Sequence, residues 1–198
     1  MITIISSALV TLVTVASLAK AGTPENPANY GKLYTYAKWD HSLTAQVNKF
    51  CVDNIGAYPE NIREQNPIQA WPCIDNNPNQ KWEWVRYKGS DNCGYIRLAG
   101  TYGKGYTGEG FCIDRFLDGP TPKLWPCNWK GTQNFCFNKR GQLEHFTYKQ
   151  DRCLDVTGTV YSDGLGFYFC SVNQVGSELR SDFNQVFWFS FMNAPSYA

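Results

Sequence analysis

The chain has 198 residues with 18 basic and 17 acidic side chains, 16% aromatic residues, 8 cysteines and 2 histidines, which fits one domain with at most a small second one. A formal net charge of +1 gives no general attraction to polyanions, so nucleic acid and an acidic membrane are poor candidate partners. The 2 histidines argue against a multi-histidine metal site, and the aromatic content excludes a disordered chain.

The first segment is predicted to be a targeting signal. Residues 1–19 are apolar or small and carry no charge before Lys20, and Ala19-Lys20-Ala21 has the small-x-small pattern of a cleavage site. The competing interpretation is a membrane anchor, but the run is barely long enough to span and contains several Ser and Thr. We therefore expect residues 1–21 to be a signal peptide, the mature protein to be secreted, and no transmembrane span to remain.

One pattern of four ordered features then occurs three times. Each copy begins with a glycine before a short strand-like run, and continues with Cys-aliphatic-Asp, an aromatic residue two positions before a cysteine, and Gln-x-aromatic. The Cys-aliphatic-Asp elements are Cys51-Val52-Asp53, Cys112-Ile113-Asp114 and Cys153-Leu154-Asp155. The aromatic elements are Trp71-Pro72-Cys73, Trp125-Pro126-Cys127 and Tyr168-Phe169-Cys170, and the closing elements are Gln80-Lys81-Trp82, Gln133-Asn134-Phe135 and Gln185-Val186-Phe187. Such repetition sets the architecture of the chain.

The three repeats predict an all-β fold. They span residues 30–84, 93–137 and 139–191, within one domain at 29–192. Their apolar stretches are short, rich in β-branched and aromatic residues, and separated by Gly, Pro, Asn and Asp clusters, with no sustained helical periodicity. A structure of three units can close on itself, which would place Trp82, Phe135 and Phe187 in one central core.

The spacing within the repeats predicts loop insertions. From the Asp to the aromatic residue there are 18, 11 and 13 positions in the three repeats, and from the aromatic residue to the closing Gln there are 9, 8 and 17. We therefore expect long loops at residues 54–66 in the first repeat and 171–183 in the third.

The ordered set of motifs resembles the ricin B-type lectin module, a β-trefoil, and the resemblance covers nearly all of the chain after residue 21. It implies one shallow sugar site in each repeat, and glycans on glycoproteins or glycolipids as partners. It also implies that the cysteines pair within repeats, as Cys51 with Cys73, Cys112 with Cys127, and Cys153 with Cys170. Cys93 and Cys136 then remain, and we expect them to join each other, with two free thiols as the alternative.

Sugar chemistry explains why these residue types occur together. A hexose presents hydroxyls and apolar C–H faces, so a site needs a carboxylate or amide for the hydroxyls and a flat ring for the carbon face. By resemblance, the first repeat has the full set, with Asp53 as the acceptor of two hydroxyls and Trp71 as the stacking platform. Gln69 and Asn79 would contact hydroxyls, and Gln80 would hold the Asp and the turn.

The other repeats match this set less completely. In the third repeat Asp155, Tyr168, Asn184 and Gln185 match, but Gly166 stands in the place of Gln69. In the second repeat Asp114, Trp125 and Gln133 match, while Thr132 replaces the Asn and Lys123 replaces the Gln. A threonine hydroxyl is shorter and a lysine cannot accept, so we expect the second repeat to bind weakly or not at all.

Two other classes of function compete with sugar binding. The same motifs also maintain turns and core, so a secreted trefoil could bind protein, or form a structural coat, with vestigial sugar pockets. A glycoside hydrolase is less well supported, because carboxylate pairs can always be found among 17 acidic residues and no nucleophile or metal-ligand grouping stands out. The sequence therefore predicts a secreted, non-enzymatic carbohydrate-binding protein, with galactose or N-acetylgalactosamine as the expected sugars and no cofactor or metal.

Overall fold

The structure is a computed structural model that describes residues 23–36, 49–56, 58, 60–90, 92–115, 121–139, 141–145, 152–156, 163–170, 185 and 187–192. The predicted signal peptide at 1–21, Asn184 and the predicted insertion at 171–183 lie outside the described residues. Within the described part of the chain, no helix is long and apolar enough to cross a membrane.

The described residues form short strands with three single-turn 3₁₀ helices, in agreement with the predicted all-β class. The strands are β1 (Tyr30–Gly31), β2 (Leu33–Tyr36), β3 (Lys49–Asn54), β4 (Ile68–Pro72), β5 (Trp82–Arg86), β6 (Cys93–Leu98), β7 (Phe111–Arg115), β8 (Pro122–Pro126), β9 (Phe135–Phe137), β10 (Leu143–His145), β11 (Arg152–Val156), β12 (Asp163–Phe169) and β13 (Phe187–Phe189). The 3₁₀ helices are η1 (Pro27–Asn29), η2 (Pro78–Gln80) and η3 (Gly131–Gln133).

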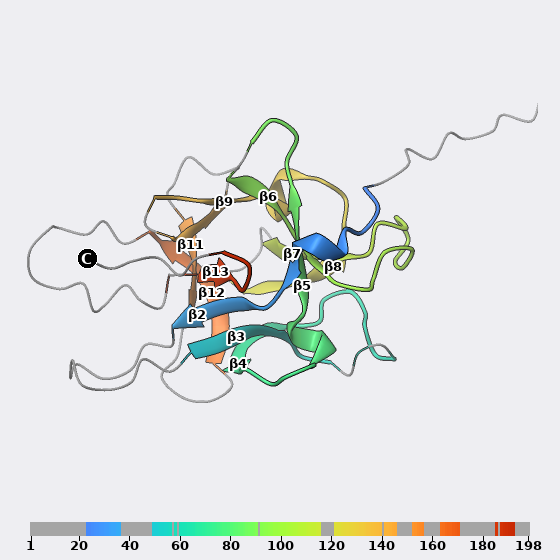
Figure 1. The fold of residues 1–198 in the computed structure, drawn as a ribbon, viewed down its shortest axis with the longest axis horizontal. Helices are drawn as coiled ribbons and strands as arrows, with labels where there is room; N and C mark the ends of the chain where they lie inside the picture. The colour runs from blue at the N-terminus through green and yellow to red at the C-terminus, as the bar shows by residue number, and fades with distance from the viewer. Residues whose placement is uncertain are drawn as a thin grey trace, which may run out of the picture.

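Strand pairing divides the chain into three equivalent units. In each unit the first strand pairs with the second and the second with the third, giving β2-β3-β4, β6-β7-β8 and β10-β11-β12, all antiparallel. Each unit also has a fourth strand, namely β5, β9 or β13. This fourth strand pairs with the first strand of the next unit, as β5 with β6, β9 with β10, and β13 with β2. Figure 1 shows the last of these pairings, with β13 in red beside β2 in blue. The fold is a β-trefoil, as the resemblance to the ricin B-type module implies.

The described residues form two buried hydrophobic clusters, and the one with more residues contains the aromatic residues that close the repeats. The aromatic residues that close the three repeats, Trp82, Phe135 and Phe187, all have an exposed fraction of 0% and belong to the same cluster. The indole nitrogen of Trp82 is also satisfied, because it donates to the Val52 carbonyl at 2.8 Å. The predicted central core is confirmed, and burial of three large aromatic side chains in one place favours the closed arrangement over separate repeats.

Disulfides link every described cysteine. The bonds join Cys51 to Cys73, Cys93 to Cys136, Cys112 to Cys127 and Cys153 to Cys170, which are the pairs that the sequence predicts. Three of them staple a strand to the turn that follows its hairpin partner. The Cys93–Cys136 bond is different, because it links β6 to β9 at directly paired positions and so joins the beginning of the second unit to its end.

The insertion of the first repeat packs against the second repeat. It connects β3 to β4, and its last residues are bonded to β8: Gln65 N donates to Leu124 O at 2.7 Å, and Leu124 N donates to Asn66 O at 2.9 Å. Tyr58 reaches further, because its hydroxyl donates to the Gly100 carbonyl at 2.9 Å. The loop predicted at 54–66 is therefore attached at several points to neighbouring parts of the barrel.

Candidate functional site

The β3–β4 hairpin places the predicted sugar-binding residues of the first repeat. Cys51 is opposite Trp71 and Asp53 is opposite Gln69 in the antiparallel register. Because side chains alternate between the two faces of a strand, Gln69 and Trp71 lie on the same face of β4, and Asp53 faces them from β3. The other hairpins have the same register, with Asp114 opposite Lys123 and Asp155 opposite Gly166. The pairing thus reproduces the correspondence between repeats that the motifs predict.

Amide side chains hold the Asp53 carboxylate on both of its oxygens. Gln69 Nε2 donates to Asp53 Oδ1 at 3.1 Å, and Asn77 Nδ2 donates to Oδ2 at 3.4 Å. Asp53 is 5% exposed, and burial raises its pKa above the ordinary value of 3.8, while hydrogen bonds from Gln69 and Gln80 oppose the rise. An ionised carboxylate has about four acceptor positions, so the three amide contacts from Gln69, Asn77 and Gln80 leave about one position for a hydroxyl donor.

Asn79 is positioned by a second asparagine. Its Oδ1 accepts from Asn54 Nδ2 at 3.2 Å, which joins the end of β3 to η2. The turn itself is capped, because the side chain of Asn77 accepts from Asn79 N at 3.0 Å and Pro78 occupies the first helical position. Asn77 therefore has a fixed orientation beside Asp53, and Asn79 has one beside Asn54.

Gln80 has a structural role in the turn. It is fully buried, its Oε1 accepts from Ile74 N at 2.8 Å, and its Nε2 donates to Pro72 O at 2.9 Å. Both partners flank the Cys51–Cys73 disulfide. Gln80 thus maintains the wall of the site from behind, as the structural interpretation of the closing Gln-x-aromatic motif predicts.

In the second repeat the Asp114 carboxylate accepts hydrogen bonds from two side chains of the same repeat. Asp114 Oδ2 accepts from Gln133 Nε2 at 2.9 Å and from Thr132 Oγ1 at 3.2 Å. Gln133 also bonds to Asn128 N and Pro126 O, in the same way as its counterpart Gln80 in the first repeat. Burial raises the pKa of Asp114 above 3.8, and the Gln133 and Thr132 bonds oppose the rise. Thr132 therefore points at the carboxylate of its own site.

In the third repeat the Asp155 carboxylate is fixed by a hydrogen bond from the closing Gln185. Asp155 Oδ2 accepts from Gln185 Nε2 at 2.8 Å, and Gln185 Oε1 accepts from Gln142 Nε2 at 2.9 Å. Asp155 is 7% exposed. The backbone of Tyr168 pairs with Cys153, as Trp71 pairs with Cys51. Asn184 is outside the described residues, so the structure brings together only part of this predicted site.

Sequence reasoning missed two residues around Asp53, namely Asn54 and Asn77. Asn77 precedes Pro78 at the start of a turn, and this Asn-Pro pair is a helix-cap signal that could have identified it. Asn54 follows the Asp of the motif and gives no such signal, because its contact with Asn79 depends on how the hairpin meets the turn. Trp129, beside the second repeat's Cys127, packs edge-on against Tyr95 with ring centroids 4.7 Å apart.

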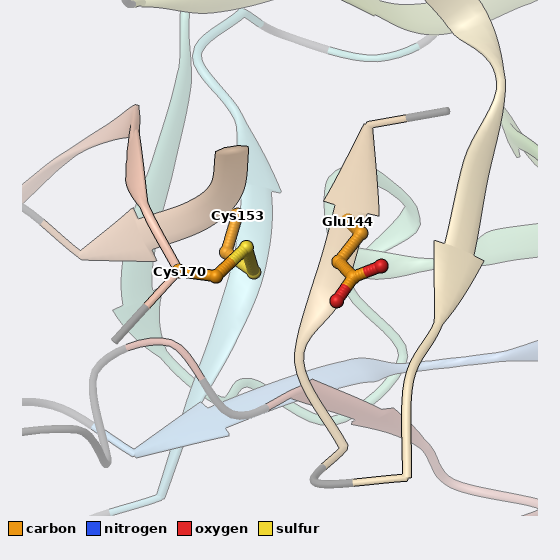
Figure 2. A group of neighbouring side chains, drawn as sticks. All are labelled: Glu144, Cys153 and Cys170. Atoms are coloured by element: carbon orange, nitrogen blue, oxygen red, sulfur yellow. A yellow bond between two sulfur atoms is a disulfide. The ribbon is translucent and has the colours of Figure 1, made fainter. Parts of the chain in front are cut away.

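One group of side chains has the arrangement of metal ligands but not their chemistry. The ligand atoms of Glu144, Cys153 and Cys170 lie within 4.8 Å of one another. Figure 2 shows that the two sulfurs are joined in a disulfide, with the Glu144 carboxylate beside them. Disulfide sulfurs are not thiolates, so this group does not provide metal ligands. Glu144 instead accepts from Asn138 Nδ2 at 2.6 Å.

Comparisons with known proteins identify the fold. No protein-family model matches the sequence, and no curated protein matches it either. Among solved structures, the designed 3-fold symmetric protein ThreeFoil is similar at 14% identity, with a TM-score of 0.55 over 81% of this chain and 97% of that one. The hemolytic lectin CEL-III is similar at 19% identity, with a TM-score of 0.51 over 83% of this chain and 30% of that one. The enzyme GalNAc-T7 is similar at 12% identity and a TM-score of 0.51, over 84% of this chain and 23% of the enzyme.

These similarities support the β-trefoil fold, although the sequences share few identical residues with this chain. The chain spans less than a third of CEL-III and of GalNAc-T7, so most of each protein lies outside the match. The β-trefoil is shared by a designed protein, a lectin and an enzyme, and a fold alone does not determine what a site does. The function therefore has to be argued from the site.

Proposed function

We propose that this protein binds carbohydrate through the site around Asp53, and through the related site around Asp155. The observation that carries the proposal is the arrangement of the first repeat, where Gln69 and Asn77 hold both carboxylate oxygens of Asp53. Trp71 lies on the same face two residues beyond Gln69. An oriented carboxylate beside an aromatic ring matches the hydroxyls and the C–H face of a hexose.

The site is preorganised, which favours affinity. Asn54 and Asn77 fix the orientation of Asn79, and Gln80 fixes the turn from behind. Side chains that are already held in place lose little conformational entropy when a ligand binds. The similarity to the lectin CEL-III is consistent with this role.

We propose further that the protein acts by binding and not by catalysis, and that terminal galactose or N-acetylgalactosamine on glycoproteins or glycolipids is the ligand. Repeats 1 and 3 would supply two shallow sites, whose simultaneous engagement of one glycan-rich surface gives avidity. Four disulfides support function in an oxidising compartment, in line with secretion after removal of residues 1–21.

Glycan-array binding of the oxidised protein tests the proposal. Asp53→Ala and Asp155→Ala should each lower affinity by about 10- to 100-fold at their own site, because each removes charge-assisted hydrogen bonds. Asp75→Ala is the matched control, since its carboxylate is 98% exposed and pairs with Lys32 on the surface. No glycan binding by the folded wild type would refute the proposed function, and unchanged binding in both variants would refute the sites.

A further inference from the structure

A pocket lies within the insertion of the first repeat, beside the site around Asp53. Its volume is about 310 Å³, and it is lined by Ile55, Gly56, Asn61, Arg63 and Asn66. This volume is at the lower end of the range of about 300–1,000 Å³ that small-molecule sites occupy. The lining combines two amides, one guanidinium and a half-exposed aliphatic side chain.

The walls of this pocket are held by hydrogen bonds at both ends of the loop. Ile55 N donates to Pro67 O at 2.9 Å at the mouth of the hairpin, and Asn66 O accepts from Leu124 N of β8. Inside the loop, Asn66 Nδ2 donates to Asn61 O at 3.1 Å. Gly56 is needed for this packing, because a Cβ there would lie 2.5 Å from Asn66 Nδ2. The pocket is thus a formed feature of the fold.

Asn54 connects the pocket to the site around Asp53. The position that a Cβ on Gly56 would take is 3.4 Å from Asn54 Nδ2, and the same nitrogen bonds to Asn79 Oδ1 at 3.2 Å. One buried asparagine therefore separates the pocket wall from the amide of the neighbouring site. The pocket and the site around Asp53 therefore meet at Asn54, and a shared oligosaccharide ligand would depend on this connection.

The charge of the lining indicates what the pocket would accept. Among the described residues that line it, Arg63 alone is charged, and its side chain is exposed. Glu60 and Glu64 belong to the same loop but do not line the pocket. A guanidinium has planar donors that match a carboxylate or a sulfate ester, and amides such as that of Asn61 both donate to and accept from hydroxyls.

We propose that this pocket is a second subsite that binds an anionic sugar unit, linked to the sugar held by Asp53 and Trp71. Arg63 takes the carboxylate or sulfate, and Asn61 and Asn66 take the hydroxyls. The inference rests on the proposed function, because it extends the ligand of the same site. It assigns a specificity to the insertion, which is longer in sequence than the corresponding connections of the second and third repeats.

Calorimetric titration of the oxidised protein provides the test. The ligands are a neutral disaccharide ending in galactose or N-acetylgalactosamine, and the same disaccharide carrying either a carboxylate sugar or a sulfate ester. At low salt the wild type should bind an anionic ligand about tenfold more tightly than the neutral one, and added salt should reduce this preference. The two anionic ligands distinguish carboxylate from sulfate as the group recognised.

Variants connect that preference to the pocket. Arg63→Gln should abolish the preference and leave the affinity for the neutral disaccharide unchanged, whereas Arg86→Gln, an exposed arginine of β5 outside the pocket, should retain the preference. Gly56→Ala should also abolish it, provided that circular dichroism shows a native fold, because its methyl group would displace Asn66.

The outcomes separate this inference from the proposed function. Wild-type binding to the neutral disaccharide without any anionic preference overturns the subsite and leaves the proposed function standing. A preference that survives in Arg63→Gln also overturns it. Absence of binding to all of the ligands by the folded protein overturns both.

Discussion

Thr132 Oγ1 donates a hydrogen bond to Asp114 Oδ2 at 3.2 Å, and this contact distinguishes the second repeat from the first. In the first repeat the corresponding residue is Asn79, which bonds to Asn54, and the amides on Asp53 come from Gln69, Asn77 and Gln80. A short hydroxyl therefore occupies one acceptor position of Asp114. The expectation that the second repeat binds weakly thus has a physical basis.

Restoring the amides should activate the second repeat. Lys123→Gln with Thr132→Asn supplies the residue types of the first repeat, and the number of sugar sites measured by calorimetry should rise by one per chain. The same double variant with Asp114→Ala should return to the wild-type number. A number of sites that stays unchanged in the double variant would contradict this explanation of why the repeat is weak.

Asn77 is expected to be a positioning residue for Asp53. Asn77→Ala should lower the affinity of the first repeat about 3- to 10-fold, because Asp53 Oδ2 loses a donor. It should also lower the free energy of unfolding by about 1 kcal/mol, because the cap of η2 is lost. Asn77→Ser, which retains a cap acceptor, should recover most of the stability. A stability loss without any change in affinity would show that Asn77 supports only the turn.

Sugar binding should weaken on acidification. Burial raises the pKa of Asp53 above its ordinary value of 3.8, so the carboxylate takes up a proton at a higher pH than a free aspartate would. Protonation removes one acceptor of sugar hydroxyls, so the affinity of the first repeat should fall as pH decreases, with a midpoint above 3.8. Asp53→Asn, measured over the same pH range, should show weak binding without this midpoint. A wild-type midpoint at or below 3.8 would contradict the effect of burial.

His145 should make the fold sensitive to acid. It is 3% exposed, and burial, followed by the nearby Arg115, lowers its pKa from 6.5 to about 4. The unfolded chain therefore binds a proton below pH 6.5 that the folded chain does not, so stability is complete above pH 6.5 and decreases as pH falls toward 4. The free energy of unfolding in urea should decrease by about 1–2 kcal/mol between pH 7.5 and 5 because of this residue.

His145→Phe is the matched variant for that measurement, since a phenyl ring can retain the edge contact of His145 with Phe135. It should show a smaller decrease in stability between pH 7.5 and 5 than the wild type. Equal decreases in the two proteins would assign the acid sensitivity to other groups.

The Cys93–Cys136 bond should contribute more to the free energy of unfolding than the Cys112–Cys127 bond. It closes a loop of 43 residues, against 15 for Cys112–Cys127, and longer loops lose more entropy in the unfolded state. Replacing both Cys93 and Cys136 with Ala should lower the free energy of unfolding by about 3–4 kcal/mol. An intact mass identical before and after reduction of this pair in an otherwise cysteine-free variant would exclude the bond.

Much of the architecture could be predicted because it is written in local spacing. The three copies of Cys-aliphatic-Asp and Gln-x-aromatic indicated the repeats and the buried aromatic residues, which depend on residues that alternate along one strand or flank one hairpin. The cysteine pairs followed from the resemblance to the ricin B-type module, with Cys93 and Cys136 as the remaining pair. The register between Asp53 and Gln69 follows in the same way, because the disulfide and the buried face allow only one alignment of the two strands.

The contacts that define the candidate sites follow from tertiary structure. Asn54 meets Asn79 across 25 residues, Thr132 meets Asp114 across 18, and Gln65 meets Leu124 in a different repeat. Nothing in the spacing of one repeat determines which donor reaches a buried carboxylate, since an amide or hydroxyl bonds to whichever acceptor the closed barrel brings within about 3 Å. The amino-acid order alone predicted three units and their shared core, because periodicity and side-chain type encode them locally, and the resemblance to a known module added the disulfide pairs. Only the tertiary structure decided which polar groups face each other, because closure of the barrel brings them together. These contacts determine how the first and second repeats differ, and they form the pocket beside Arg63.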